Sequence, residues 1–239
     1  MSGPPWPTLV LMPGMDGTGT LFAPFLAALP PDLPTRVLRY PPDRALGYPA
    51  LEAIASAQLP DGDLVLLGES FSGPLAVALA AKLGPRVRGL VLCCTFVRSP
   101  SPFLRFVRPL TRWVPVEATP RWVLFRALLD PAGPPALRPL LLDAMAQVAP
   151  RALRERLHAM AGVDARAALA TCRSHVLYLQ AGRDRLVPSA CGDLVLAVRP
   201  DATRLTLEGP HGLLQTLPSP CARAVVDFVR RSTGSPISA

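Results

Sequence analysis

The sequence predicts a three-layer α/β/α sandwich built around a mostly parallel sheet. Apolar, β-branched runs of strand length alternate along the chain with segments of helical pattern. These runs are continuously apolar rather than alternating, which is typical of strands that helices cover on both faces. With 239 residues and 50% hydrophobic content, the chain is long enough for one α/β domain with a large core.

Six segments have the pattern of strands, and prolines and glycines separate them from the helical patterns that lie between. The expected strands span residues 8–12, 36–39, 64–67, 89–94, 176–181 and 203–207. The expected helices span residues 20–28, 50–58, 73–83, 190–198 and 212–231. Because parallel strands are joined by right-handed crossovers, we expect these helices to cover both faces of the sheet.

One long interval breaks the alternation. Residues 97–169 contain no strand pattern, and prolines divide them into helical pieces at residues 103–114, 121–129, 135–148 and 151–160. We expect this interval to form a helical cap or lid, inserted into a core made of residues 1–96 and 170–239. Eleven arginines and five acids lie between Arg98 and Ala168, so this interval holds most of the net charge of +8.

Two sets of side chains in the expected cap each allow two interpretations. The aromatic set either lines an apolar pocket or packs the cap on the core, and comprises Phe103, Phe106, Trp113, Trp122 and Phe125. The basic set either receives an acidic partner or forms a solvated face. Its members include Arg105, Arg108, Arg112, Arg151, Arg154 and Arg156.

Composition argues against several classes of protein. The first residues lack the positive segment and apolar core of a secretory signal, so we expect none. The sequence contains no uninterrupted run of about 18 apolar residues, so we expect no membrane-spanning helix. Five cysteines without C-x-x-C spacing favour a reduced, cytoplasmic chain without structural zinc. The excess of basic over acidic residues suggests nucleic-acid binding as a candidate function. The sequence contains no aromatic-basic module or known motif for it, so we expect no nucleic-acid partner.

A candidate nucleophile stands where an apolar strand pattern meets a helical one. Residues 68–73 read Gly-Glu-Ser-Phe-Ser-Gly, so Ser70 has a small residue two positions away on either side. A serine on a sharp strand-to-helix turn needs such neighbours because the two backbones approach closely. Ser72 stands where the usual pattern has its second glycine. The alternative is that Ser72 is itself the nucleophile, but Pro74 would then occupy a position that needs a small residue, and proline fits that close approach poorly.

A serine nucleophile needs a base, and the base needs an orienting acid. His211 lies in a Gly-Pro-His-Gly loop directly after the last expected strand. Asp184 follows the fifth expected strand and precedes His211, which matches the chain order serine, acid, histidine. The less well placed rivals are His158, His175, Asp193 and Asp201. We therefore predict catalytic roles for Ser70, Asp184 and His211.

A tetrahedral oxyanion needs two backbone donors that are already in place. We expect one to be the N–H of Phe71, directly after the candidate nucleophile. We expect the other to be the N–H of Met15, in the Pro-Gly-Met-Asp-Gly loop after the first strand. A phosphate-binding loop is the alternative for this string, but the string lacks the Walker lysine and the dinucleotide-binding spacing.

Ser70, Asp184 and His211 in this order, together with the Pro-Gly-Met-Asp-Gly loop, resemble the pattern of the α/β-hydrolase family over residues 8–231. The Leu-x-Pro-Gly-x-Asp-Gly-Thr-Gly string is similar to the esterase, lipase, thioesterase and acyltransferase-like branch of that family. The resemblance implies a minimal six-stranded sheet of order 2-1-3-4-5-6 with a helical cap. The family's two leading edge strands are absent from the pattern.

The resemblance also implies a serine hydrolase that cleaves a carboxylic ester or thioester through an acyl-serine intermediate, without a metal or organic cofactor. The expected partner is a small acyl ester or thioester, presented alone or on an acidic acyl carrier protein. In that case the aromatic set of the cap could line an acyl pocket, and the basic set could receive the carrier protein or a coenzyme A phosphate. An acyltransferase, or a thioesterase acting on carrier-bound or coenzyme A thioesters, would use the same three residues. A non-catalytic binding protein of the same fold is the alternative from a different class.

Overall fold

Within residues 6–129 and 133–234, the strands form one parallel sheet of six in the order β2-β1-β3-β4-β5-β6. The structure is a computed structural model that describes residues 6–129 and 133–234. The strands are β1 (Thr8–Met12), β2 (Thr35–Val37), β3 (Leu64–Glu69), β4 (Val87–Cys93), β5 (His175–Ala181) and β6 (Thr203–Leu207). The predicted fold class and strand order are confirmed.

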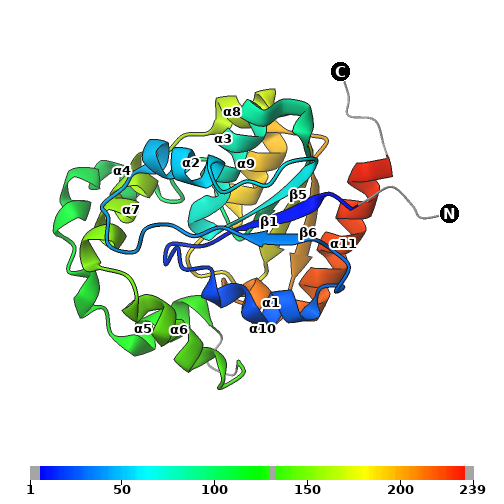
Figure 1. Cartoon of the computed structure of the whole chain (residues 1–239). Helices are drawn as coiled ribbons and strands as arrows, with labels where there is room; N and C mark the ends of the chain where they lie inside the picture. Colours follow the sequence, from blue (N-terminus) through cyan, green and yellow to red (C-terminus); the bar gives the residue numbers. More distant parts are fainter. Residues whose placement is uncertain (1–5, 130–132, 235–239) are drawn as a thin grey trace.

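Helices cover both faces of this sheet, as the continuous apolar runs predicted (Figure 1). One face packs on α2 (Tyr48–Ser56), α3 (Gly73–Leu83), α8 (Arg166–Thr171) and α9 (Ala190–Val198). The other face packs on α1 (Ala23–Ala28), α10 (Leu213–Thr216) and α11 (Pro218–Gly234). Successive side chains of a strand point to opposite faces, so Val10 and Leu66 lie in the first cluster while Leu9 and Leu67 lie in the second.

Four further helices gather on one side of the molecule, beyond the ends of the strands (Figure 1). They are α4 (Pro102–Phe106), α5 (Arg121–Leu128), α6 (Leu137–Ala146) and α7 (Pro150–Gly162), with short 3-10 segments at Arg108–Trp113 and Val116–Ala118. We call residues 102–162 the cap. An isolated antiparallel bridge between Arg98 and Asp164 joins the two chain segments that lead into and out of it.

The expected elements differ from the structure mainly where proline interrupts a helix. The expected helix 103–114 is divided into α4 and a 3-10 segment, with Pro109 near the junction. The expected helix 212–231 is divided in the same way at Leu217, before Pro218. Ala165 and Leu169, near the end of the expected insertion, pack in the core against α3.

Three short parts of the chain lie outside the described residues. They are residues 1–5, on which the expectation of no leader segment depends, residues 130–132 within the expected cap, and residues 235–239. Among the helices of the described part, none is both long and apolar enough to cross a membrane.

Candidate active site

Ser70 lies on a sharp turn between β3 and α3. Its φ of 50° is in the left-handed region, which a non-glycine residue adopts only under strong local constraint. A Cβ at Gly68 would come within 2.8 Å of the carbonyl oxygen of Ser72, and one at Gly73 would collide with the Thr95 side chain. The glycines therefore allow the close approach that turns the chain and exposes the Ser70 side chain.

Ser72, the residue that departs from the usual pattern, is fully buried. Its hydroxyl donates to the carbonyl oxygen of Pro13 and accepts a hydrogen bond from the Tyr40 hydroxyl, with an O–O distance of 2.6 Å. Both bonds occupy the hydroxyl inside the protein. Ser72 therefore ties the turn to the loop after β1, and the alternative of Ser72 as nucleophile finds no support in the geometry.

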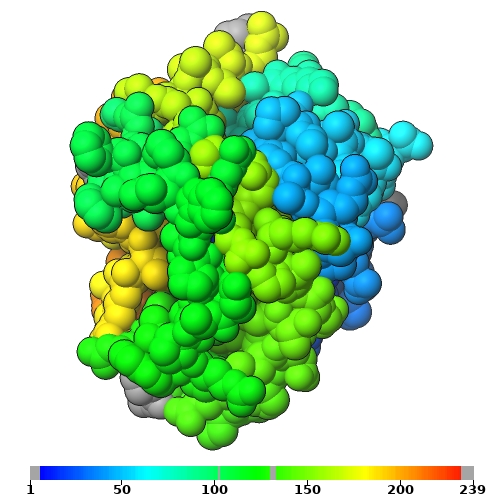
Figure 2. Space-filling model, turned by 90° about the vertical axis from the view of Figure 1, so that its left-hand side faces the viewer, coloured from blue at the N-terminus to red at the C-terminus, as the bar shows by residue number. Residues whose placement is uncertain are grey.

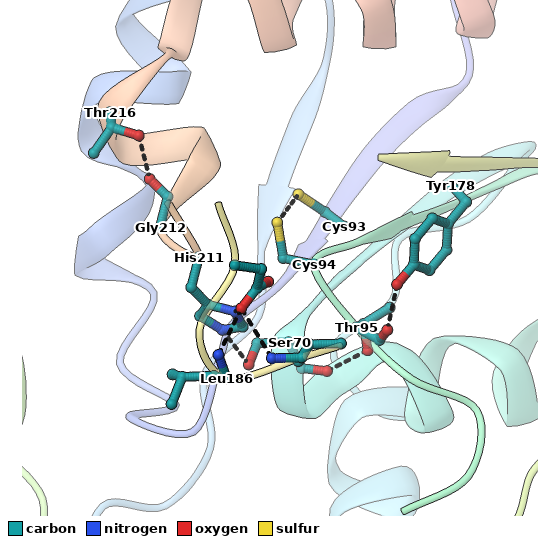
Figure 3. Close-up of polar contacts among 11 residues, drawn as sticks. Ser70, Cys93, Cys94, Thr95, Tyr178, Leu186, His211, Gly212 and Thr216 are labelled. Atoms are coloured by element: carbon teal, nitrogen blue, oxygen red, sulfur yellow. Dashed lines mark hydrogen bonds and ion pairs between the residues drawn. The ribbon is translucent and has the colours of Figure 1, made fainter. Parts of the chain in front are cut away.

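The structure brings Ser70, His211 and Asp184 into one line of hydrogen bonds. Figure 3 shows the Ser70 and His211 side chains of this line next to each other. The Ser70 hydroxyl oxygen lies 2.8 Å from Nε2 of His211. Nδ1 of His211 lies 2.8 Å from Oδ2 and 3.0 Å from Oδ1 of Asp184. The side chains of His211 and Asp184 are each 5% exposed, so this ion-pair geometry is shielded from water.

Asp184 is held by its own turn after β5. Its Oδ1 accepts the backbone N–H groups of Leu186 and Val187 at 2.8 and 2.9 Å. These two bonds orient the carboxylate, and the remaining oxygen faces the imidazole. The turn function that such an aspartate commonly has and the orienting role toward His211 are thus compatible in one side chain.

The rival residues lie elsewhere. His158 contacts the Thr111 hydroxyl and the Arg108 carbonyl on the cap, and His175 begins β5. Asp193 and Asp201 form ion pairs with Arg204 and Arg199 near the surface, with N–O distances of 2.5 and 2.6 Å.

Both segments expected to supply oxyanion donors flank Ser70. Phe71 is fully buried, its ring stacks on Tyr48 with centroids 4.8 Å apart, and the Tyr48 hydroxyl donates to the Phe71 carbonyl at 2.9 Å. Across the site, a Cβ added at Gly14 would lie 3.9 Å from Cβ of Ser70, which places the loop of Met15 beside Ser70.

Thr95 stabilises the turn that carries Ser70. Its hydroxyl donates to the Ser70 carbonyl, and its own carbonyl accepts the Tyr178 hydroxyl at 2.7 Å (Figure 3). These contacts join the segments that directly follow β3 and β4 to the middle of β5. The position of Ser70 is therefore set by three neighbouring strands rather than by its own turn alone.

Comparison with known proteins shows the family of this chain. A model of the alpha/beta hydrolase family matches residues 9–226. The chain belongs to this family. The predictions of the family and of an ester hydrolase are therefore confirmed.

This hydrolase is similar to proteins named pimeloyl-[acyl-carrier protein] methyl ester esterase. One from Xanthomonas oryzae pv. oryzae is 33% identical over 228 residues, covering 85% of this chain and 87% of that protein. Another from Aromatoleum aromaticum is 29% identical, covering 94% and 98%. The structure of an enol-lactonase from Burkholderia xenovorans matches with a TM-score of 0.79 at 20% identity, covering 94% and 92%, and shows likeness of fold alone.

Glu69, which sequence reasoning did not single out, is a buried acid directly before Ser70. Burial raises its pKa to about 7, and the hydrogen bond from Nε2 of Gln215 at 2.9 Å opposes that rise only in part. Oε1 of Gln215 is buried without a partner among the described residues, so a protonated Glu69 offers a donor near an unsatisfied acceptor. An acid closing a continuous apolar strand was the signal available in the sequence.

The raised pKa of Glu69 predicts a pH-dependent stability. Between about pH 4.5 and about pH 7 the folded protein holds a proton that the unfolded chain has released. Unfolding free energy should therefore fall across this window, by about 3 kcal/mol from this group, and level off above it. Glu69→Gln should remove the fall in urea denaturation curves, whereas Glu52→Gln at a partly exposed acid should retain it. If the free energy of unfolding fell with pH by the same amount in wild type and in Glu69→Gln, the prediction would be contradicted.

The aromatic side chains of the cap do not pack around Ser70. Phe103, Phe106, Trp113 and Trp122 are 67–87% exposed, and Phe125 packs within the cap beside Leu129 and Leu141. Figure 2 shows the face on which residues of α4 to α7 spread side by side. The four exposed rings therefore neither line an acyl pocket nor pack the cap on the core.

The arginines of the cap divide into two kinds. Arg105, Arg108, Arg112 and Arg151 are exposed, and Arg154 is half-buried beside Glu117. Arg156 is the exception, because it is only 1% exposed and its guanidinium bonds to backbone carbonyls inside the protein. The interpretation of Arg156 as part of a partner-binding or solvated face is therefore wrong. It follows Ala152 and Leu153 at helical spacing on the buried side of α7, a pattern that could have shown its burial.

Proposed function

We propose that this hydrolase cleaves the methyl ester of an acyl chain carried by an acidic acyl carrier protein, with Ser70 as the nucleophile. The observation that carries the proposal is the 2.8 Å contact between the Ser70 hydroxyl and Nε2 of His211, whose Nδ1 faces Asp184. A serine hydroxyl attacks only with an adjacent base, and this geometry supplies one. The names of the relatives contribute the methyl ester and the carrier.

In the first half of the reaction, Nε2 of His211 accepts the proton of Ser70 while Oγ bonds to the ester carbonyl carbon. The oxyanion that forms accepts hydrogen bonds from the N–H groups of Met15 and Phe71. The imidazolium, stabilised by Asp184, then donates its proton to the departing alkoxide, so methanol leaves and an acyl-Ser70 ester remains.

In the second half, water takes the place of methanol. His211 accepts a proton from the water as its oxygen attacks the acyl-Ser70 carbonyl, and the same two N–H groups bind the new oxyanion. Collapse returns the proton to Ser70 and releases the free carboxylic acid. Neither half requires a metal ion or an organic cofactor.

The outer face of the cap supports the carrier as partner. Arg105 and Phe106 border a surface cavity of about 660 Å³, and Arg108, Arg112 and Trp113 border another of about 720 Å³. Exposed arginines beside exposed aromatic rings suit an acidic protein surface, because charge guides the encounter and apolar contact holds it. None of the residues named here belongs to the catalytic machinery.

The carrier proposal predicts a salt-sensitive substrate preference. We expect the acyl methyl ester attached to an acyl carrier protein to have a kcat/KM at least about tenfold above that of the same acyl group on a small thiol. Raising sodium chloride from about 50 to about 500 mM should abolish the preference. Arg105→Glu and Arg108→Glu should lower kcat/KM for the carrier-bound ester alone.

A matched control comes from an edge strand of the sheet, outside the cap. Arg36→Glu, on the exposed edge strand β2, changes the net charge equally and should leave the preference intact. Equal kcat/KM for both substrates at low salt would overturn the carrier part of the proposal. Ester hydrolysis itself would be overturned by the absence of turnover on every methyl ester tested.

We also propose a reducing compartment such as the cytoplasm. All five cysteines are free and buried, and the neighbouring thiols of Cys93 and Cys94 share a hydrogen bond at 3.9 Å rather than a disulfide. The hydrogen bond with the Cys94 thiol and burial both raise the pKa of Cys93, which keeps this thiol protonated and a poor nucleophile. Because all five cysteines are buried, we assign them a role in core packing.

A further inference from the structure

A buried arginine of the cap holds the loop that carries Met15. Nη1 of Arg156, on α7, donates to the carbonyl oxygens of Met15 at 2.7 Å and of Asp16 at 2.8 Å. Nη2 donates to the carbonyl oxygen of Pro41 at 2.9 Å. One guanidinium therefore joins the cap to two loops at the edge of the sheet where Ser70 lies.

The loop leaves space for this guanidinium. Gly17 has a φ of +70°, and a Cβ there would come within 2.8 Å of Nη1 of Arg156 and 3.0 Å of the Tyr40 ring. Cζ of Arg156 lies 5.8 Å from the centroid of the Tyr40 ring, a favourable position for a cation. Any other residue at position 17 would strain the turn and displace the guanidinium.

Burying this cation costs free energy that an apolar residue would not cost. Ala152 and Leu153 show that the same side of α7 packs apolar side chains, yet position 156 carries an arginine. Its acceptors named above are main-chain carbonyls, and its Nε has no partner among the described residues. What arginine adds over an apolar residue is a fork of charge-assisted hydrogen bonds to the loop.

The bonds of Arg156 restrict the peptide groups that follow Met15 and, through the hydrogen bond from the Gly17 N–H to the Gly14 carbonyl, the peptide group that carries the Met15 N–H. Each peptide is planar, so holding the carbonyls of Met15 and Asp16 fixes the two planes that follow Met15. On the other side, Ser72 binds the Pro13 carbonyl, and the N–H of Gly17 closes the turn on the Gly14 carbonyl at 3.1 Å. The loop is thus held from the core and from the cap together.

We propose that Arg156 is a positioning residue that orients the Met15 N–H toward the oxyanion. The rate of reaction then depends on the position of the cap relative to the loop that carries Met15. The proposal rests on the proposed function, because it takes Met15 as an oxyanion donor. Donors of this kind accelerate the reaction only if they are in place before the negative charge develops. The side chain of Met15 also packs on Val148, Ala152 and Leu153 of the cap region, which adds to the same coupling.

The test uses Arg156→Met and Arg156→Lys with a small neutral p-nitrophenyl ester, which removes any effect of carrier binding. Arg156→Met should lower kcat about a hundredfold and change KM less than about threefold, because the loss falls on the transition state. Affinity for an alkyl boronic acid, which forms a tetrahedral adduct on serine, should fall by a similar factor. Arg156→Lys should lose less, because an ammonium group reaches a carbonyl but cannot form the fork.

The neighbouring Arg154→Gln is the matched control. Arg154 lies on the same helix, but its partner is Glu117 near the surface, so kcat and boronic acid affinity should stay at the wild-type level. Circular dichroism and thermal unfolding define the temperature at which each variant is folded, and kinetics are measured below it.

Folded Arg156→Met with a wild-type kcat would overturn the inference while leaving the proposed function intact. A loss confined to KM, or a fall in melting temperature with unchanged kcat and inhibitor affinity, would likewise show a purely structural arginine. If the wild-type protein turned over no ester, the proposed function would fail first, so the two failures are distinguishable.

Discussion

Replacing Ser70 by alanine is expected to lower kcat by roughly 10⁴-fold or more, because the substitution removes the atom that forms the acyl intermediate. Alanine and serine both carry a Cβ and have a similar steric cost at the φ of 50° found at position 70, so the fold of the turn should persist. Turnover of a methyl ester and labelling by a fluorophosphonate probe measure the effect. Labelling should vanish, since the probe reacts with an activated serine hydroxyl.

Ser72→Ala is the matched control for this experiment. It removes the hydrogen bonds to Pro13 and Tyr40 and leaves two buried polar groups unsatisfied, which should destabilise the protein by about 1–3 kcal/mol. The Ser70 hydroxyl and its contact with His211 remain, so labelling should persist. Labelling that vanished in Ser72→Ala and persisted in Ser70→Ala would overturn the assignment of the nucleophile.

The second large effect is expected for Asp184→Asn, with a loss of about 10⁴-fold in kcat near neutral pH. The N–H groups of Leu186 and Val187 require an acceptor at Oδ1, so the asparagine oxygen should stay there. Its amide NH₂ then takes the place of Oδ2, 2.8 Å from Nδ1 of His211. Two donors cannot face each other, so the imidazole proton moves to Nε2, which then cannot accept the proton of Ser70.

Asp193→Asn and Asp201→Asn are the controls, because each removes an aspartate that forms an ion pair at the surface. Surface pairs contribute about 1 kcal/mol or less, so both variants should keep wild-type kcat. Nitrogen NMR of the His211 ring would report the tautomer in Asp184→Asn directly. A kcat within about tenfold of wild type in that variant would count against Asp184 as the orienting acid.

The regular part of the fold was predictable because its signals are local. The apolar runs at Thr8–Met12 and Thr203–Leu207 match the strands residue for residue, and so does the helical pattern at Gly73–Leu83. The ends of the cap helices were less predictable, because prolines allow a 3-10 turn or a break and the choice depends on packing.

The meeting of Ser70, Asp184 and His211 was also predictable, although 114 and 27 positions of sequence separate them in turn. Each follows a parallel strand, and the carboxyl ends of parallel strands lie at one edge of the sheet. The sequence pattern thus contained the chemistry, and the topology supplied the proximity.

The burial of Arg156 and Glu69 was not predictable in the same way. Counting charges placed Arg156 on a basic surface, whereas the guanidinium is enclosed by carbonyls from loops more than a hundred residues away in sequence. Glu69 ends an apolar strand, but only the packing of α10 and the contact with Gln215 reveal that its carboxyl group is without water.

By itself the sequence determined the order of elements, the parallel sheet and the candidate triad, because strand and helix periodicity and turn chemistry are properties of neighbouring residues. Only the tertiary structure decided which polar side chains lose their water and which main-chain groups they bind. Burial and the pKa of an enclosed acid arise from segments that are distant along the chain and meet only in the folded molecule.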